Sequence, residues 1–430
     1  MIKVLLKNII EKIPYPFGSL LSKIPFSLRL GKDYNAFKTQ INTFETLEKK
    51  EQYVIEKFNA IFQYAKVNFP FYQEFYEKEG VMNLEIKTLD DIKKVPILNK
   101  SDIRHHTHRF KGALKINTGG TTGEPFSFYV DKNAFAREWA HMHKIWRLKG
   151  YSYKDIKVTL RGKDLGKRNI IYNPVHNEFI INTYRSVEVF KNELVNLFSK
   201  REIKFIHGYP SAVYNFLKEL EHCLSKEEKK IITKNLKACL LGSEFPTPII
   251  KKYIDSVWGL DYISWYGHSE MCILAYDAGN NKYAPFYTYG FAEVDNNRLI
   301  GTSYFNKDMP LIRYNTGDLV SPNYSKNGLL KNFSIKEGRE GEFIVDKSGK
   351  KIPLTALIFG RHHKAFDVVD FVQVKQNQTS LFVTFYLITK NKKIETDGLL
   401  NLDNILIDYT VEVIENPIKT KLGKVQLKVK

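Results

Sequence analysis

Cysteine is scarce in this chain of 430 residues, which contains only Cys223, Cys239 and Cys272. No two of them form a CxxC pair, so the sequence supports neither a disulfide framework nor a cysteine-rich zinc site. We therefore expect a reducing compartment, the cytoplasm.

The sequence also lacks an apolar run long enough to cross a membrane. Residues 1–26 are apolar and basic, but lysine, glutamate and proline interrupt them. Two interpretations stay open for this N-terminal segment. It either makes peripheral contact with a membrane surface or packs against its own domain.

Acidic residues are in the minority, because Lys and Arg number 66 while Asp and Glu number 47, which gives a net charge of +19. This excess favours an anionic partner: nucleic acid, an acidic membrane surface or a phosphate-bearing small molecule. No recognised nucleic-acid module is present, so we expect no nucleic-acid partner. Hydrophobic residues at 43% and charged residues at 26% are typical of globular proteins, and the length predicts two or three domains.

Hydrophobic periodicity outlines the fold. Two segments, residues 46–66 and 135–146, carry apolar side chains at helical spacing. These are Val54, Phe58, Ile61, Phe62 and Ala65 in the first segment, and Phe135, Trp139, Met142 and Trp146 in the second. From residue 156 to 265, short apolar runs alternate with helical patterns, which predicts an α/β sheet.

The chain therefore divides into a large α/β N-terminal domain and a small α+β C-terminal domain. We expect residues 1–337 to form the first, with a mostly helical leader region at 1–110 and a β-rich subdomain that begins at Phe291. The second spans residues 343–430, with a strand pair, two strands, a polar helix and a strand in that order.

A glycine-rich segment, TGGTTGEP at residues 118–125, has the composition of a phosphate cradle. Glycines let backbone N–H groups approach an anion, and threonine hydroxyls hydrogen-bond phosphate oxygens. The spacing and lysine of an NTPase P-loop are missing. A surface turn without a ligand is the alternative interpretation of this segment alone.

Three further segments follow it, namely LGSEFP at 241–246, WYGHSEM at 265–271 and RYNTGD at 313–318. In this order they resemble the core motifs of the adenylate-forming enzyme superfamily. The phrases FPFYQEFY, KVPILNKSDIR, HGYPSAV and MPLIRYNTGD are similar to its phenylacetate-CoA ligase-like branch, which includes capsular polysaccharide biosynthesis proteins. The resemblance covers nearly the whole chain.

The resemblance implies roles residue by residue for ATP and Mg²⁺. Tyr266 would stack on adenine, Asp318 would accept hydrogen bonds from the ribose hydroxyls, and Glu270 would bind magnesium. Ser269 stands where threonine is usual and would reach the α-phosphate. The remaining nucleotide-binding positions are Thr118, Gly119, Gly120, Thr121, Thr122 and Gly123 for the phosphates, Gly242, Ser243, Glu244 and Gly267 for the adenine pocket, and Arg339 for ribose.

The end of the chain would supply a catalytic lysine. KTKLGKVQLKVK at 419–430 resembles a terminal loop whose lysine reaches the α-phosphate, and Lys424 matches best. The C-terminal domain would then be a lid hinged at residues 338–342, although glutamate stands at Glu342 where aspartate is usual. A solvated lysine run is the alternative for Lys424.

The implied function is an AMP-forming ligase that activates a carboxylic acid with Mg-ATP and transfers the acyl group to an acceptor. Coenzyme A is the default acceptor, and an amine in capsular or surface polysaccharide synthesis is the alternative. A non-enzymatic basic protein that binds nucleic acid or membrane is the rival from another class. Two interpretations stay open for His207 as well, a core histidine or a residue bordering the acyl pocket.

Overall fold

The computed structural model describes residues 13–41, 46–117, 127–161, 165, 167–183, 185–243, 245–339, 343–349, 351–359, 363–369, 371–391, 394–403, 405–418 and 427–429. Within these ranges, no helix has both the length and the apolar content needed to cross a membrane.

Helices dominate the described part of the first 110 residues. They are α2 (Phe17–Ser22), α3 (Phe26–Leu30), α4 (Lys32–Gln40), α5 (Leu47–Asn68), α6 (Pro70–Lys78), α7 (Leu89–Lys94), α8 (Lys100–Arg104) and the 3₁₀ helix η1 (Thr107–Arg109). Helix α5 begins at Thr46, whose side chain accepts a hydrogen bond from the Lys49 backbone N–H. Its predicted apolar stripe, from Val54 to Ala65, is buried.

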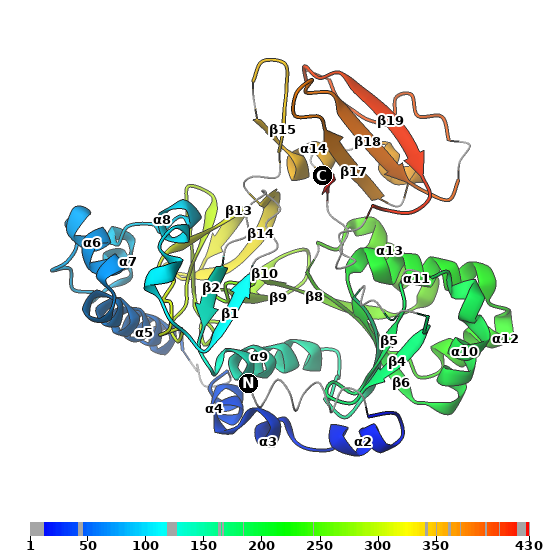
Figure 1. Cartoon of the computed structure of the whole chain (residues 1–430), viewed down its shortest axis with the longest axis horizontal. Coiled ribbons are helices and arrows are strands. Elements are labelled where there is room, and N and C mark those ends of the chain that lie inside the picture. Colours follow the sequence, from blue (N-terminus) through cyan, green and yellow to red (C-terminus); the bar gives the residue numbers. More distant parts are fainter. Residues whose placement is uncertain are drawn as a thin grey trace.

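The large domain is organised around one twisted sheet, which has twelve strands within the described residues, in the order β11-β12-β13-β14-β10-β9-β8-β7-β6-β3-β5-β4 (Figure 1). Strands β5, β3, β6, β7 and β8 pair in parallel, and the other pairings are antiparallel. The bounds are β3 (Ile156–Leu160), β4 (Ile170–Asn173), β5 (Glu178–Ile181), β6 (Ile203–Gly208), β7 (Ala238–Leu241), β8 (Asp261–Gly267), β9 (Leu274–Asp277), β10 (Tyr283–Pro285), β11 (Phe291–Asp295), β12 (Arg298–Thr302), β13 (Tyr314–Tyr324) and β14 (Leu330–Arg339).

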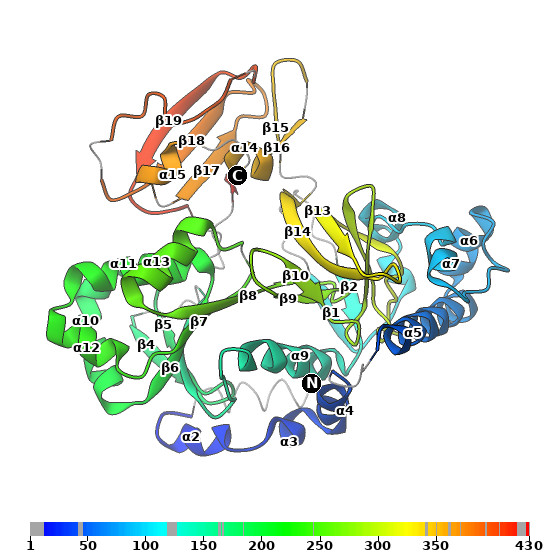
Figure 2. The same ribbon diagram turned by 180° about the vertical axis from the view of Figure 1, so that it is seen from behind.

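Helices cover both faces of the parallel strands. Successive strand residues point to opposite faces, so neighbours in one strand pack against different helices. Phe205 on β6 packs in the cluster of α9 (Ala134–Arg147), whereas Ile206 packs with the helices on the other face. Those helices are α10 (Val187–Lys200), α11 (Pro210–Cys223), α12 (Lys226–Thr233) and α13 (Pro248–Trp258), seen together in Figure 2. The predicted α/β class is confirmed.

The predicted β-rich region after Phe291 consists of β11 to β14, which extend the central sheet. One detail of the sequence prediction is wrong in this domain. Phe135, predicted on the buried stripe of α9, is 44% exposed, while His141 and Arg137 are buried. The neighbours of α9 lie on several sides, so its buried surface is wider than one apolar stripe.

The C-terminal elements have their own core. They are β15 (Phe343–Val345), β16 (Lys351–Pro353), α14 (Leu354–Phe359), α15 (Ala365–Val368), β17 (Phe371–Gln376), β18 (Val383–Ile388), β19 (Tyr409–Ile414) and β20 (Lys428–Val429). Residues from Ile344 to Leu402 form a separate hydrophobic cluster. The predicted polar helix before β19 is absent from residues 394–403 and 405–408, where Gly398 turns the chain at φ +68°.

Candidate functional site

The parallel strands β6, β7 and β8 end at the same edge of the sheet, and the predicted site residues follow these ends. In open α/β sheets, ligands bind at the carboxyl ends of the strands. Gly242 and Ser243 follow β7, while Gly267 is the last residue of β8 and precedes Ser269 and Glu270. The fold thereby brings two of the predicted motifs to one edge.

After β7, the backbone passes directly over an aromatic ring. A Cβ atom at Gly242 would lie 2.1 Å from Cζ2 of Trp265, so only glycine fits without movement. Ser243 has φ +69° and is exposed, and its hydroxyl lies 3.3 Å from Nη2 of Arg161. Gly242 is thus buried against Trp265, and Ser243 is the exposed residue at this end of β7. Glu244 lies outside the described residues.

Tyr266 and Asp318 come from different strands and meet in the interior. The Tyr266 hydroxyl donates to Asp318 Oδ2 at 2.5 Å, and the two residues are 8% and 7% exposed. The Tyr266 ring also packs edge-on against Phe333, with ring centroids 5.3 Å apart. The sequence analysis named both residues but did not predict the hydrogen bond from Tyr266 to Asp318.

A tight turn aims Asp318. Gly317 has φ +76°, and the Thr316 hydroxyl accepts a hydrogen bond from the Asp318 backbone N–H at 3.2 Å. Across the ladder, Asp318 on β13 is paired in register with Arg339 on β14. The structure therefore juxtaposes the backbones of the two predicted ribose-binding residues, although the side chain of Arg339 lies outside the described part.

Glu270 is oriented through both of its carboxylate oxygens. The Tyr314 hydroxyl donates to Oε1 at 3.2 Å, and Nδ1 of His268 lies 3.1 Å from Oε2. Because Nε2 of His268 accepts the Ile273 backbone N–H at 3.2 Å, the proton of a neutral imidazole is on Nδ1, facing Glu270. Sequence reasoning missed His268 and Tyr314, although both stand inside the quoted motifs. Ser269, in contrast, is exposed.

Glu270 is the one predicted metal ligand. Among the residues that the structure describes, no three His, Cys, Asp or Glu side chains gather where they could hold a metal ion. Magnesium is usually bound through one or two carboxylates together with substrate phosphates and water. A single buried, oriented carboxylate fits a magnesium ion that arrives with a nucleotide.

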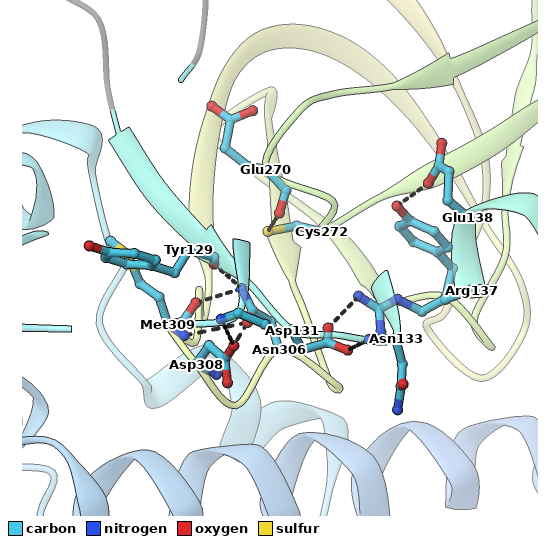
Figure 3. Close-up of polar contacts among 12 residues, drawn as sticks. Tyr129, Asp131, Asn133, Arg137, Glu138, Glu270, Cys272, Asn306, Asp308 and Met309 are labelled. Carbon is cyan, nitrogen blue, oxygen red and sulfur yellow. Dashed lines mark hydrogen bonds and ion pairs between the residues drawn. The ribbon is translucent and has the colours of Figure 1, made fainter. Parts of the chain in front are cut away.

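The predicted phosphate cradle connects the antiparallel strands β1 (Leu114–Asn117) and β2 (Ser127–Val130). A neighbouring loop fixes this hairpin: Asn306 Nδ2 donates to the Tyr129 carbonyl at 2.8 Å, and Asp308 Oδ2 accepts from the Ala113 N–H at 2.7 Å (Figure 3). The cradle residues Thr118, Gly119, Gly120, Thr121, Thr122 and Gly123 themselves lie outside the described residues, as do Glu342 and Lys424.

Helix α9 supplies a charged wall beside this region, also drawn in Figure 3. Arg137, 1% exposed, donates to Asp131 at 3.1 Å, and the Tyr289 hydroxyl donates to Glu138 at 2.5 Å. Burial raises the pKa of the Glu138 carboxyl. Sequence reasoning did not predict these contacts, and the partner of Glu138 is 151 positions away.

His207 lies at the end of β6 and is 6% exposed. Its ring stacks on Trp265 with centroids 6.1 Å apart and lies 5.0 Å from the ring of Trp146. Burial, reinforced by the charge of Arg161, lowers the pKa of His207 well below its usual range. The imidazole is therefore neutral near pH 7 and packs against Trp146 and Trp265, whose rings also contact each other.

Comparison with known proteins gives the following similarities. No family model matches the chain. It is 22% identical over 360 residues to the Staphylococcus aureus Protein CapK, with 78% of each sequence covered. The structure of 2-hydroxyisobutyryl-CoA ligase in the postadenylation state with 2-HIB-AMP aligns at a TM-score of 0.63 and 14% identity over 90% of both chains. An open conformation of that ligase with 2-HIB-AMP and CoA aligns at 0.52 and 13% identity over 88% of this chain and 91% of the other.

Proposed function

This chain has the fold of the adenylate-forming ligases, and we propose that it is an AMP-forming acid ligase. A substrate carboxylate oxygen would attack the α-phosphorus of Mg-ATP, the bond to the bridging oxygen would break, and pyrophosphate would leave. The resulting acyl adenylate would then pass its acyl group to an acceptor and release AMP. The proposal places the enzyme in the cytoplasm, where ATP is available.

The observation that carries the proposal is the Asp318 carboxylate, held by the Tyr266 hydroxyl at 2.5 Å at the ligand-binding edge of the sheet. A carboxylate has oxygens to accept hydrogen bonds from both hydroxyls of a ribose. The Tyr266 hydroxyl donates to Oδ2 and so fixes the direction of this carboxylate. Arg339, opposite Asp318 in the ladder, would bind the same ribose.

We propose that the remaining site residues bind different parts of the nucleotide. Gly242, Ser243, Glu244 and Gly267 would border adenine with Tyr266, while residues 118–123 would bind the phosphates through N–H groups and hydroxyls. Ser269 would reach the α-phosphate. Glu270 would hold magnesium, which when bound neutralises phosphate charge. Lys424 would stabilise the charge that develops at the α-phosphate, delivered by the C-terminal domain as a lid hinged at residues 338–342.

Coenzyme A is the acceptor we propose first, in keeping with the CoA-bound ligase of similar fold. The alternative is an amine in surface polysaccharide synthesis, which the similarity to CapK keeps open. These acceptors differ only in the second half-reaction, so both require the same adenylation site.

ATP–pyrophosphate exchange against aryl, fatty, amino and hydroxy acids tests the proposal without knowledge of the acceptor. We expect exchange with at least one acid. Glu74→Ala, which removes an exposed carboxylate bonded to Arg109, is the matched control for site variants and should keep the wild-type rate. The rival basic binding protein would show neither exchange nor a rise in melting temperature with ATP.

A further inference from the structure

The short helices α2 and α3, with the link between them, expose large apolar side chains to solvent. Their large apolar residues Phe17, Leu20, Ile24 and Leu28 are 70%, 61%, 39% and 75% exposed. We call these four residues the apolar ridge. Phe17 and Leu20 lie on α2, Leu28 lies on α3, and Ile24 lies in the link between the two helices. Both ribbon views show α2 and α3 along the outer margin of the large domain (Figure 1 and Figure 2).

The face turned toward the protein carries mainly small residues. Gly18 and Ser22 are the buried residues of α2, and Phe26 is the buried residue of α3. A Cβ atom at Gly18 would lie 2.9 Å from Cβ of Pro174, so the helix packs too closely for a larger side chain there. Helix α2 thus uses small residues for the internal contact and directs Phe17 and Leu20 outward, whereas α3 buries Phe26 and directs Leu28 outward.

Hydrogen bonds of Arg29 hold the segment that carries the apolar ridge. The Arg29 guanidinium donates to the carbonyls of Ile24 at 2.7 Å, Ser22 at 2.8 Å and Val175 at 2.6 Å. It also lies over the Phe26 ring, 4.3 Å from the centroid. These contacts join the link between α2 and α3 to the β4–β5 turn, so the outward orientation of the ridge is fixed by the fold.

Basic residues surround the ridge in sequence and space. Residues 13–41 contain Lys23, Arg29, Lys32 and Lys38 against the single acid Asp33, and the three lysines are exposed. A groove of about 370 Å³ beside Tyr15 is lined in part by Lys200 and Arg201. In sequence, residues 1–12 add Lys3, Lys7 and Lys12 against Glu11. Exposed apolar side chains flanked by lysines are the signature of a segment that lies on an anionic membrane.

We propose that the apolar ridge docks the protein onto the surface of an anionic lipid membrane. Phe17, Leu20, Ile24 and Leu28 enter the boundary between headgroups and acyl chains, and Lys23 contacts lipid phosphates. The net charge of +19 favours the same surface over a neutral one. A second copy of this chain suits the site less well, because two like-charged ridges would repel each other.

Sedimentation of the full chain with lipid vesicles tests this docking. The wild type should bind phosphatidylcholine vesicles that contain phosphatidylglycerol, and bind pure phosphatidylcholine more weakly. Leu20→Ser with Leu28→Ser should reduce the binding by at least about tenfold, because two apolar side chains no longer enter the lipid. Lys23→Ala should reduce only the preference for phosphatidylglycerol.

The matched control is Val67→Ser with Val189→Ser, which removes two apolar side chains that are 74% and 64% exposed elsewhere. This control should bind vesicles as the wild type does. All variants should keep the wild-type melting temperature and pyrophosphate exchange, so a loss of vesicle binding reports the ridge and not the ligase site.

Three results would overturn the docking proposal: no vesicle binding by the wild type, equal binding by the ridge variant, or equal loss in the control. Light scattering that shows a dimer dispersed by the ridge substitutions, without vesicle binding, would assign the ridge to a second copy instead. Absence of exchange in a protein that binds vesicles would contradict the ligase proposal alone.

Discussion

Asp318 shows at the scale of one residue what a motif specifies and what only the fold supplies. TGD in the sequence points to a nucleotide-binding carboxylate, but also suits an ordinary turn aspartate. The fold brings in Tyr266 from β8, 52 positions earlier, to hold its carboxylate. No periodicity in the sequence encodes this pair, because long-range contacts of polar side chains leave no local signal.

Asp318→Ala should weaken adenylation strongly. Loss of charge-assisted contacts to ribose corresponds to about 2–4 kcal/mol, or a fall of about thirtyfold to a thousandfold in exchange per unit ATP. Tyr266→Phe should cause a smaller fall, because the carboxylate stays but loses one partner. Unchanged ATP affinity and exchange in folded Asp318→Ala protein would remove that residue from the site.

Glu270→Gln should raise the magnesium concentration needed for half-maximal exchange by about tenfold, because a neutral amide binds a hard dication more weakly than a carboxylate does. The amide oxygen can still accept one of the two hydrogen bonds that Tyr314 and His268 make to the carboxylate, whereas the amide nitrogen cannot accept the other, so the melting temperature of the variant is measured beside its rate. Exchange rate against magnesium concentration measures the effect. A curve that overlays the wild type would mean that another group binds the metal.

His141 predicts a pH dependence of stability. Burial lowers its pKa to about 3, while an unfolded histidine titrates near about 6.5. Between these values the unfolded chain binds a proton that the folded chain does not. The free energy of unfolding is therefore retained above the unfolded pKa and falls as pH decreases, by up to about 1.4 kcal/mol per pH unit for this group.

His141→Gln should flatten this dependence, because glutamine does not titrate and can still bond the Arg137 carbonyl and Thr288. His143 and His207, whose pKa values burial also lowers, should keep part of the slope. Urea unfolding of both proteins at several values between about pH 7 and pH 5 gives the comparison. Equal slopes would show that His141 is not a buried neutral group in solution.

At the scale of elements, local patterns were predictive where one face alone is buried. The buried apolar stripe of α5 was predicted correctly from the sequence, since the other faces of this helix are exposed to solvent. The buried surface of α9 was not predicted correctly, because Phe135 is exposed while His141 and Arg137 are buried through contacts from several directions. The polar helix expected before β19 failed for a local reason, a glycine with positive φ at Gly398.

The close approach of Gly242, which follows β7, to Trp265 on the neighbouring strand β8 gives a prediction. Alanine there would force its Cβ into the Trp265 ring, so the free energy of unfolding should fall by about 1–3 kcal/mol. Adding Trp265→Leu should cost less in the alanine background than in the wild type, because the smaller side chain frees that space. Denaturant titrations of the four proteins would show this coupling. Strict additivity would mean that the two residues do not touch.

At the scale of the molecule, the C-terminal elements pack in a hydrophobic cluster of their own, distinct from the clusters around the large sheet, in keeping with the fold class predicted from the sequence. The boundary itself stays a prediction. Strand β14 reaches Arg339, so the first two residues of the expected hinge belong to a strand. The separate sequence patterns indicate these two parts of the chain, whereas motion of the C-terminal part as a lid stays a proposal, because hydrophobic periodicity carries no signal for it.

Lys424→Ala should separate the half-reactions. If the C-terminal domain delivers this lysine only for adenylation, the variant should lose pyrophosphate exchange yet still transfer the acyl group from a chemically supplied adenylate. Lys421→Ala, a neighbour in the same lysine run, is the control and should keep both activities. Rapid-quench measurement of each step decides, and equal loss of both steps would contradict a lysine dedicated to adenylation.

The most direct test of the central claim follows one oxygen atom. With an acid that supports exchange, labelled with ¹⁸O in its carboxylate, attack on the α-phosphorus and later acyl transfer must leave a carboxylate oxygen on the phosphate of AMP. Mass spectrometry of the quenched reaction should therefore find AMP that carries ¹⁸O, formed much more slowly by Asp318→Ala. Unlabelled AMP, or the label in inorganic phosphate beside ADP, would show that the protein does not form an acyl adenylate.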